Sequence, residues 1–158
     1  MKSLIVYYSR SGKTKKLSES ISKEINCNLE EIVSKRGRNG TLGFLISGYE
    51  ASRKKLAKIG DMKNDPSIYD LVIIGTPIWA GRMSSPVRTY ITKNRDRFPK
   101  VAFFITHGGA DAGKAMAELQ ELCGKKPVGT LAVRTTDVNQ GKYLQNVKEF
   151  VAAISKEN

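Results

Sequence analysis

Three hydroxyl side chains and one glycine stand close together near the start of the sequence: Ser9, Ser11, Gly12 and Thr14. They follow the apolar run 4–8, which is typical of a buried parallel strand, and they precede a helical pattern. Hydroxyl groups and the free N–H groups of a helix N-terminus bind phosphate oxygens, and glycine lets the backbone come close to them. The opening of the sequence therefore predicts a site for a phosphorylated ligand.

The same loop also carries Arg10 and Lys13, which either face solvent or act on the charge of the ligand from a distance. Gly12-Lys13-Thr14 imitates the end of the nucleoside-triphosphate loop G-x-x-x-x-G-K-[ST], but the position of its first glycine is Tyr7. No predicted strand ends in a convincing magnesium-binding aspartate. G-x-G-x-x-G does not occur in the sequence, so a dinucleotide fingerprint is not supported either.

A second loop is predicted at 75–86, after the apolar run 71–74. It holds the only tryptophan, Trp79, whose indole either stacks on a planar ring or packs over the end of the sheet as apolar cover. Pro77 restricts the backbone and Gly81 releases it, which suits a loop that wraps a flat ligand. Main-chain groups of this loop would then bind the heteroatoms of the ring.

A third loop, 106–114, follows the apolar run 101–105 and contains Gly108 and Gly109, which permit close approach of the backbone to a ligand. His107 is the only histidine of the chain. Because it has no Ser or Cys partner in a triad motif and no second histidine for a metal, a structural or ligand-edge role is favoured over that of a general base. We therefore assign no catalytic residue and no metal ligand. Asp111 is expected to cap the next helix.

The rest of the sequence predicts the elements that position these loops. Strands are expected at 4–8, 29–33, 71–74, 101–105 and 129–133, each followed by apolar residues at helical spacing. One of these patterns, marked by Leu42, Ile46 and Tyr49, predicts an amphipathic helix that reaches about Lys58. Strict alternation indicates a single α/β domain over 1–158, with a parallel sheet and helices on both faces. Ligands bind beyond the carboxyl ends of such strands, where the three loops lie.

Composition limits the class of protein. No apolar stretch approaches the ~20 residues of a membrane helix, and the chain is expected to begin in a strand rather than in a signal peptide. Two cysteines far apart, Cys27 and Cys123, suggest a reduced, cytoplasmic protein. The net charge is +12, which reflects either solvated surfaces or attraction to acidic partners, an anionic membrane surface or nucleic acid. No nucleic-acid motif supports the last of these.

Three segments resemble the short-chain flavodoxins and related flavodoxin-like FMN-binding proteins, over essentially the whole chain: LIVYYSRSGKT, YDLVIIGTPIWAGRMSSPV and FFITHGG. The resemblance implies a doubly wound, five-stranded parallel sheet of order 2-1-3-4-5, with FMN at the switch point between the first and third strands. It further implies that residues 9–14 hold the FMN phosphate. The isoalloxazine would be lined by Thr76, Pro77, Ile78, Trp79, Ala80 and Gly81, and contacted from the other side by Thr106, His107, Gly108 and Gly109.

The resemblance implies an electron-transfer protein that carries one or two electrons between redox partners. The alternative is an enzyme, either an FMN-dependent NAD(P)H:quinone oxidoreductase or a flavodoxin-like protoporphyrinogen oxidase. Flavodoxins are typically acidic whereas this chain is basic, so its partners are expected to have acidic docking surfaces, and peripheral contact with a membrane is compatible with the charge. Arg10, Lys13 and Arg82 near the predicted site are expected to make the second reduction potential less negative than in acidic flavodoxins.

Overall fold

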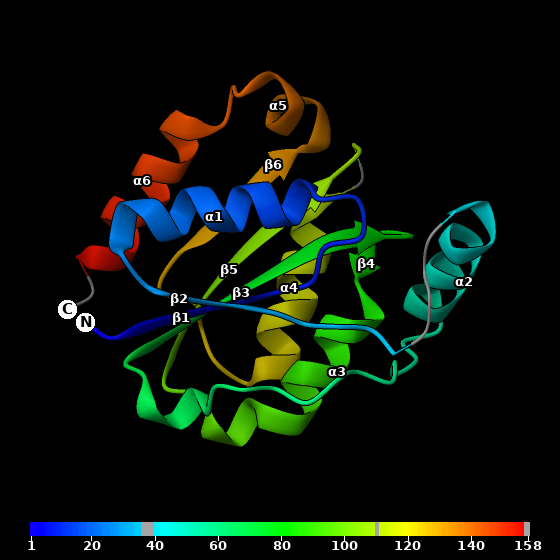
Figure 1. Cartoon of the computed structure of the whole chain (residues 1–158), viewed down its shortest axis with the longest axis horizontal. Coiled ribbons are helices and arrows are strands. Elements are labelled where there is room, and N and C mark those ends of the chain that lie inside the picture. The colour runs from blue at the N-terminus through cyan, green and yellow to red at the C-terminus, as the bar shows by residue number, and fades with distance from the viewer. Residues whose placement is uncertain (36–39, 110, 157–158) are drawn as a thin grey trace.

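The computed structural model describes residues 1–35, 40–109 and 111–156. A parallel sheet has the order β2-β1-β3-β5-β6, with strands at Ser3–Tyr7 (β1), Asn28–Glu31 (β2), Leu71–Trp79 (β3), Lys100–His107 (β5) and Thr130–Arg134 (β6) (Figure 1). A two-residue strand, Arg82–Met83 (β4), pairs antiparallel with the end of β3. When β4 is set aside, this is the predicted order 2-1-3-4-5, so the doubly wound arrangement is confirmed.

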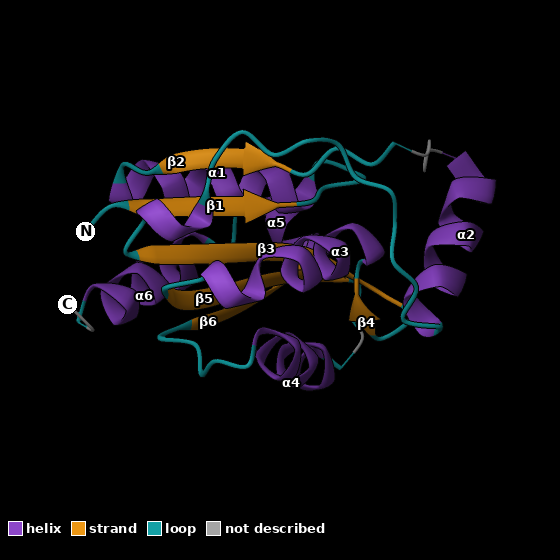
Figure 2. Ribbon diagram, turned by 90° about the horizontal axis from the view of Figure 1, so that it is seen from below, coloured by secondary structure: helices purple, strands orange, loops and turns teal. Residues whose placement is uncertain are grey.

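Helices cover both faces of the sheet, as Figure 1 and Figure 2 show. Helices α1 (Lys13–Ile25), α5 (Thr135–Gln140) and α6 (Leu144–Ser155) pack on one face and share an apolar cluster with it. Helices α3 (Ser85–Asn94) and α4 (Ala112–Cys123) pack on the other. Helix α2 (Gly40–Ser52) stands at the end of the sheet, and two short 3-10 helices lie at Pro66–Ile68 and Arg95–Arg97.

The central strands β1, β3 and β5 are buried on both faces, which explains their continuous apolar runs. The edge strand β6 alternates between exposed and buried residues instead. The predicted strands therefore exist, with ends that differ by a few residues from the expected ones. Helix α5 was not predicted, because its six residues carry too short an apolar pattern to show a helical period.

The start predicted for the second loop is wrong, because β3 continues through Gly75 as far as Trp79. Gly75 belongs to the strand because the ring of Phe104 on β5 occupies the space beside it: a Cβ at Gly75 would lie 2.0 Å from Phe104 Cζ. A glycine inside a strand often marks such a close approach rather than a loop. Ala80 and Gly81 then turn the chain back with φ of 47° and 73°, the positive values that a two-residue hairpin turn requires.

The prediction for the helix around residues 41–58 is wrong in its end and in its buried face. Helix α2 ends at Ser52, and its buried residues are the small ones at every fourth position: Gly43, Ser47 and Ala51. Of the three residues that marked the predicted buried face, Leu42 and Tyr49 are exposed and Ile46 is half-buried, and Phe44 and Leu45 of the same helix are exposed as well. Small residues allow the helix backbone to approach β3, β4 and α3, which it contacts.

Candidate functional site at the carboxyl edge of the sheet

The three predicted loops meet at the carboxyl ends of β1, β3 and β5, which are neighbours in the sheet. The first and second are joined where the Tyr8 N–H donates to the Gly75 carbonyl (3.2 Å). The first and third are joined by a buried hydrogen bond of 2.8 Å between the hydroxyls of Thr14 and Thr106. The structure therefore brings together the segments that the sequence singled out, although they lie up to 92 residues apart.

The first loop leaves the N-terminus of α1 open for a ligand. Gly12 takes the N-cap position with φ of 81°, and no side chain among the described residues caps the helix there. The first N–H groups of a helix have no partner within it, so they remain available as donors. Ser9 Oγ is buried and lacks a hydrogen-bond partner among the described residues. A buried hydroxyl without a partner is unusual in a folded protein.

Trp79 ends β3 and is buried, with 6% of its surface exposed. Its ring packs edge to face against Tyr8 (centroids 5.4 Å apart, planes at 86°). In this conformation the indole covers the end of the sheet, which is the second of the two roles considered for it. Pro77, Ile78 and Gly81 are partly exposed and Ala80 is exposed, so the surface that this hairpin offers is largely backbone and small side chains.

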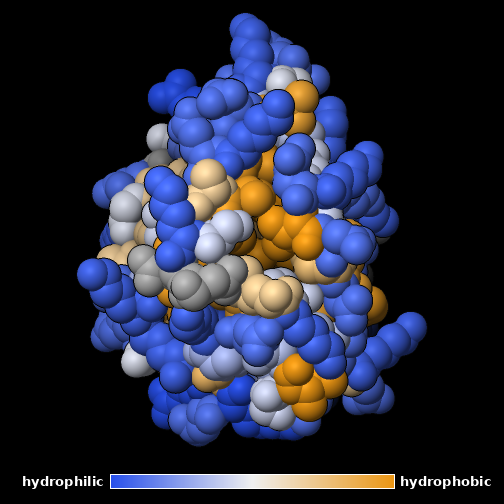
Figure 3. Space-filling model, turned by 90° about the vertical axis from the view of Figure 1, so that its left-hand side faces the viewer, coloured by the Kyte–Doolittle hydropathy of each residue, from blue (hydrophilic) through white to orange (hydrophobic). Residues whose placement is uncertain are grey.

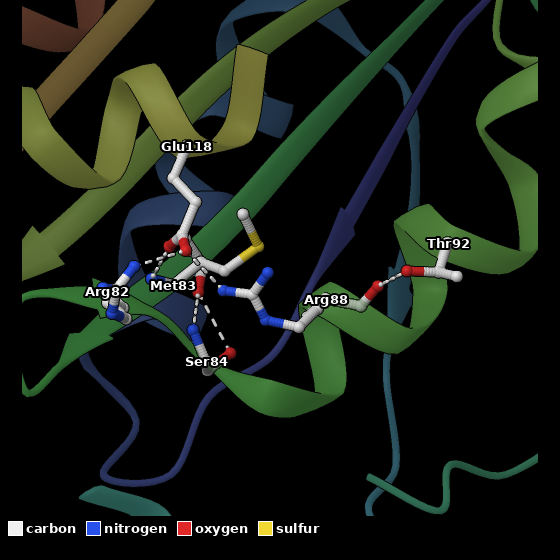
Figure 4. Close-up of polar contacts among 7 residues, drawn as sticks. Arg82, Met83, Ser84, Arg88, Thr92 and Glu118 are labelled. Atoms are coloured by element: carbon white, nitrogen blue, oxygen red, sulfur yellow. Dashed lines mark hydrogen bonds and ion pairs between the residues drawn. The ribbon is translucent and has the colours of Figure 1, made fainter. Parts of the chain in front are cut away.

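The hairpin formed by β3 and β4 is held by Glu118 of α4, which points toward it (Figure 4). One carboxylate oxygen accepts from Arg82 Nη1 (2.9 Å) and from Arg88 Nη2 (2.7 Å), and the other accepts from the Met83 N–H (3.3 Å). Thr76 Oγ1 accepts from the Ser84 N–H (3.0 Å) and ties the two arms of the hairpin together. Burial acts to raise the pKa of Glu118, but the hydrogen bond and charge of Arg88, aided by Arg82 and the Met83 N–H, bring it below its usual value.

Sequence reasoning missed Glu118 and Arg88. A signal was present, because position 118 lies on the apolar stripe of its helix, beside Ala115, Leu119 and Leu122. An acidic residue on a buried stripe needs a partner, and Arg88 occupies the matching place in the apolar pattern of α3. Arg82, which we expected to act on the flavin charge, pairs with Glu118, but Arg88 shares the same carboxylate, so the two guanidinium groups are only partly neutralised.

In the third loop, Thr106 is buried at the end of β5 and His107 is half-buried, while Gly108 and Gly109 are exposed. Asp111 caps α4, as predicted, by accepting hydrogen bonds from the N–H groups of Gly113 and Lys114. His107 Nδ1 is buried and has no hydrogen-bond partner among the described residues. Burial, together with the charge of Arg134 paired opposite it on β6, lowers the pKa of His107.

We expect Arg134→Gln to raise the pKa of His107 toward its ordinary value, because one of the two causes of the lowering is then removed. The measurement is proton NMR of the imidazole against pH, and its signal is unambiguous because the chain has one histidine. Lys142→Gln, an exposed change outside the sheet, is the control. An unchanged titration in Arg134→Gln would show that Arg134 does not act on this ring.

A separate pocket of about 480 Å³ lies at the other end of the molecule, lined by Met1, Tyr69, Asp70, Pro99 and Lys100. Figure 3 shows the side of the molecule that holds the amino ends of the strands, where apolar side chains gather in a hollow among hydrophilic ones. This pocket shares no residue with the three loops, so it is separate from the candidate site at the carboxyl edge of the sheet.

Solved structures of similar fold are flavodoxins and related proteins. A flavoprotein from Lactobacillus acidophilus, solved in complex with FMN, is 29% identical over 88% of this chain and 97% of its own, with a TM-score of 0.72. Flavodoxin 2 from Bacillus cereus is 17% identical over the full length of both chains (TM-score 0.66), and Megasphaera elsdenii flavodoxin is 16% identical over 98% of both (TM-score 0.64). No protein-family model and no curated protein sequence matches the chain.

The wound sheet, with its loops meeting at the switch point between β1 and β3, defines a flavodoxin-like fold. Coverage of nearly all of each matched structure shows that the likeness is not confined to one motif. The chain is therefore similar in fold to flavodoxins and flavodoxin-like FMN proteins, which is the resemblance that its three sequence segments indicated.

Proposed function

We propose that this protein binds FMN across the three loops and carries electrons between redox partner proteins. The observation that carries the proposal is the open N-terminus of α1 with the buried, unpartnered Ser9 hydroxyl beside it among the described residues. A similar chain from Lactobacillus acidophilus was solved with FMN, and it covers most of this chain. When bound, FMN supplies the capacity to take up and release one or two electrons.

The first loop fits the phosphate end of FMN. The N–H groups at the start of α1 and the hydroxyls of Ser9 and Ser11 are donors, and the phosphate dianion would sit at the positive end of the helix dipole. Gly12 has nothing within 4 Å of the place of a Cβ, so a ligand can approach its backbone. The Thr14 hydroxyl is hydrogen-bonded to the Thr106 hydroxyl, so Thr14 links the first loop to the third.

The hairpin and the third loop fit the flat end of FMN. Residues 76–81 and 106–109 present backbone groups from two adjacent strands. Glu118 holds the hairpin in place by accepting a hydrogen bond from the Met83 N–H. The Trp79 ring packs edge to face on Tyr8 and so connects the end of β3 to the residue that follows β1. We propose that backbone donors and acceptors of these segments orient the isoalloxazine, and that Arg10 and Lys13 act on its charge.

Replacement of Ser9 by alanine is expected to weaken FMN binding about tenfold to a hundredfold, the loss of one hydrogen bond to a charged acceptor. Binding of riboflavin, which lacks the phosphate, is expected to stay the same. The measurement is a titration followed by visible absorption. Ser155→Ala, at the exposed end of α6, is the control. Equal losses for FMN and riboflavin would contradict a phosphate role for Ser9.

Electron transfer is tested with the FMN-loaded protein, an NADPH-dependent flavodoxin reductase and a haem-protein acceptor. We expect acceptor reduction to require both the reductase and this protein, and to slow as ionic strength rises because the partner meets a basic surface. NADPH consumption with a quinone and without any reductase would overturn the carrier role in favour of an enzyme.

A further inference from the structure

Helix α2 directs large apolar side chains away from the protein. Leu42, Leu45 and Tyr49 are 71%, 63% and 54% exposed, and their spacing of three and four residues places them on one face of the helix. The opposite face, with Gly43 and Ser47, is the buried one. Figure 2 shows α2 at the end of the molecule, beyond the ends of the strands. This outward face is not needed to complete the core.

Apolar exposure continues beside the outward face of α2. Phe44 and Leu56 are each more than half exposed, and the Arg10 guanidinium of the first loop lies over the Phe44 ring at 4.9 Å from its centroid. Soluble proteins carry scattered exposed apolar residues, but a cluster on one small helix marks an interaction surface.

The sequence on both sides of α2 is basic. From residue 33 to residue 58 the sequence holds one acidic residue, Glu50, against the basic residues Lys35, Arg36, Arg38, Arg53, Lys54, Lys55 and Lys58. Arg53 and Lys55 lie near the Tyr49 ring, 6.0 and 4.8 Å from its centroid. The Lys35 N–H bonds the Lys58 carbonyl at 2.9 Å, so the segments before and after α2 are joined.

We propose that the outward face of α2, with the exposed basic residues Arg53, Lys54 and Lys55 that follow it, docks the protein on an anionic lipid membrane. A helix that lies flat on a bilayer places apolar side chains at the acyl boundary and cations among the headgroups, each cation adding to the attraction. No helix formed by the described residues has the length and apolar character to cross a bilayer, so the contact is with the surface.

The shape of the surface favours a membrane over other occupants. The apolar side chains stand on the outside of a helix, and a bilayer receives them without a matching groove. A second copy of the chain would bring the same cations against one another, which is unfavourable for a molecule of charge +12. Because α2 contacts β3 and β4 and Arg10 reaches Phe44, docking would place the carboxyl edge of the sheet beside the lipid.

Vesicle flotation tests the docking without reference to FMN. Wild-type protein is mixed with vesicles of phosphatidylcholine alone or with about 30% phosphatidylglycerol, at low and high salt. We expect binding to the anionic vesicles only, weakened by salt, and a loss of at least about tenfold in Leu42→Ser/Leu45→Ser. The control is Ile68→Ser/Leu144→Ser, which removes two comparably exposed apolar residues elsewhere and should bind as wild type does.

Failure of the wild type to bind anionic vesicles overturns the proposal. So does an equal loss in the control pair, because the outward face of α2 would then have no special part. If vesicles are ignored and a polyglutamate column retains the wild type but not Leu42→Ser/Leu45→Ser, the surface belongs to an acidic protein instead. Circular dichroism spectra of both double variants check that they are folded.

Discussion

Replacing Glu118 with alanine is expected to lower the free energy of unfolding by about 3–5 kcal/mol, because it leaves Arg88 buried without a counter-charge. Arg88 is only 5% exposed, so little of its guanidinium contacts solvent while the carboxylate is in place. The Met83 N–H and Arg82 lose their acceptor in the same change, which frees the hairpin. The measurement is the urea midpoint and slope, and weaker FMN binding should accompany the loss.

Glu121→Ala is the matched control, since Glu121 lies on the same helix and is exposed. A loss within about 0.5 kcal/mol of that control would contradict the role of Glu118. The effect also depends on pH. The pKa of Glu118 is lowered by folding, so its stabilisation is complete above the unfolded-state pKa of about 4.3 and disappears as pH falls through the lower folded-state value. Below that value the difference in stability between the wild type and Glu118→Ala should be smaller than at neutral pH, because the charge of the carboxylate no longer contributes.

Gly75→Ala is expected to destabilise the protein by about 3 kcal/mol or more, the upper range for overpacking. The added Cβ would fall 2.0 Å from Phe104 Cζ and 2.5 Å from Cε2. Phe104 is fully buried in the apolar cluster that the sheet shares with α1 and α6, so the ring or the backbone must shift against packed neighbours. Thermal or urea unfolding measures the cost.

Two further variants show whether the clash is the cause. Gly48→Ala, on α2 with nothing within 4 Å of the new Cβ, is expected to be neutral or stabilising by up to about 1 kcal/mol. In a Phe104→Ala background, where the ring is absent, Gly75→Ala should cost almost nothing. Additive losses in the double variant would show that the two residues do not compete for the same space.

The fold could be predicted from the sequence because its signals are local and repeated. Burial on both faces of a parallel sheet explains the apolar runs of β1, β3 and β5. Packing of one helix face against the sheet explains the apolar stripes of the helices. The end of β3 could not be predicted in the same way. Gly75 and Pro77 suggest a loop locally, and only the Phe104 ring of a neighbouring strand shows why a glycine stands inside the strand.

The candidate site was predictable in outline, and its supports were not. The three loops carry recognisable residues, and chain topology alone brings them to one edge. The apolar patterns indicate that Glu118 and Arg88 are buried, but the partners of Glu118 lie 30 and 36 residues away, so the patterns do not show which side chains pair. The buried face of α2 was misjudged for a related reason: apolar side chains were assumed to face the core, whereas Gly43, Ser47 and Ala51 permit the closest packing.

Parallel titrations of the purified protein with FMN and with riboflavin, at one fixed salt concentration, test the central claim most directly. We expect one-to-one binding of FMN that is tighter than that of riboflavin by at least about a hundredfold. Only FMN has a phosphate that can accept hydrogen bonds from the N-terminus of α1 and from the Ser9 hydroxyl. Equal affinity for the two ligands, or no binding of FMN, would contradict it.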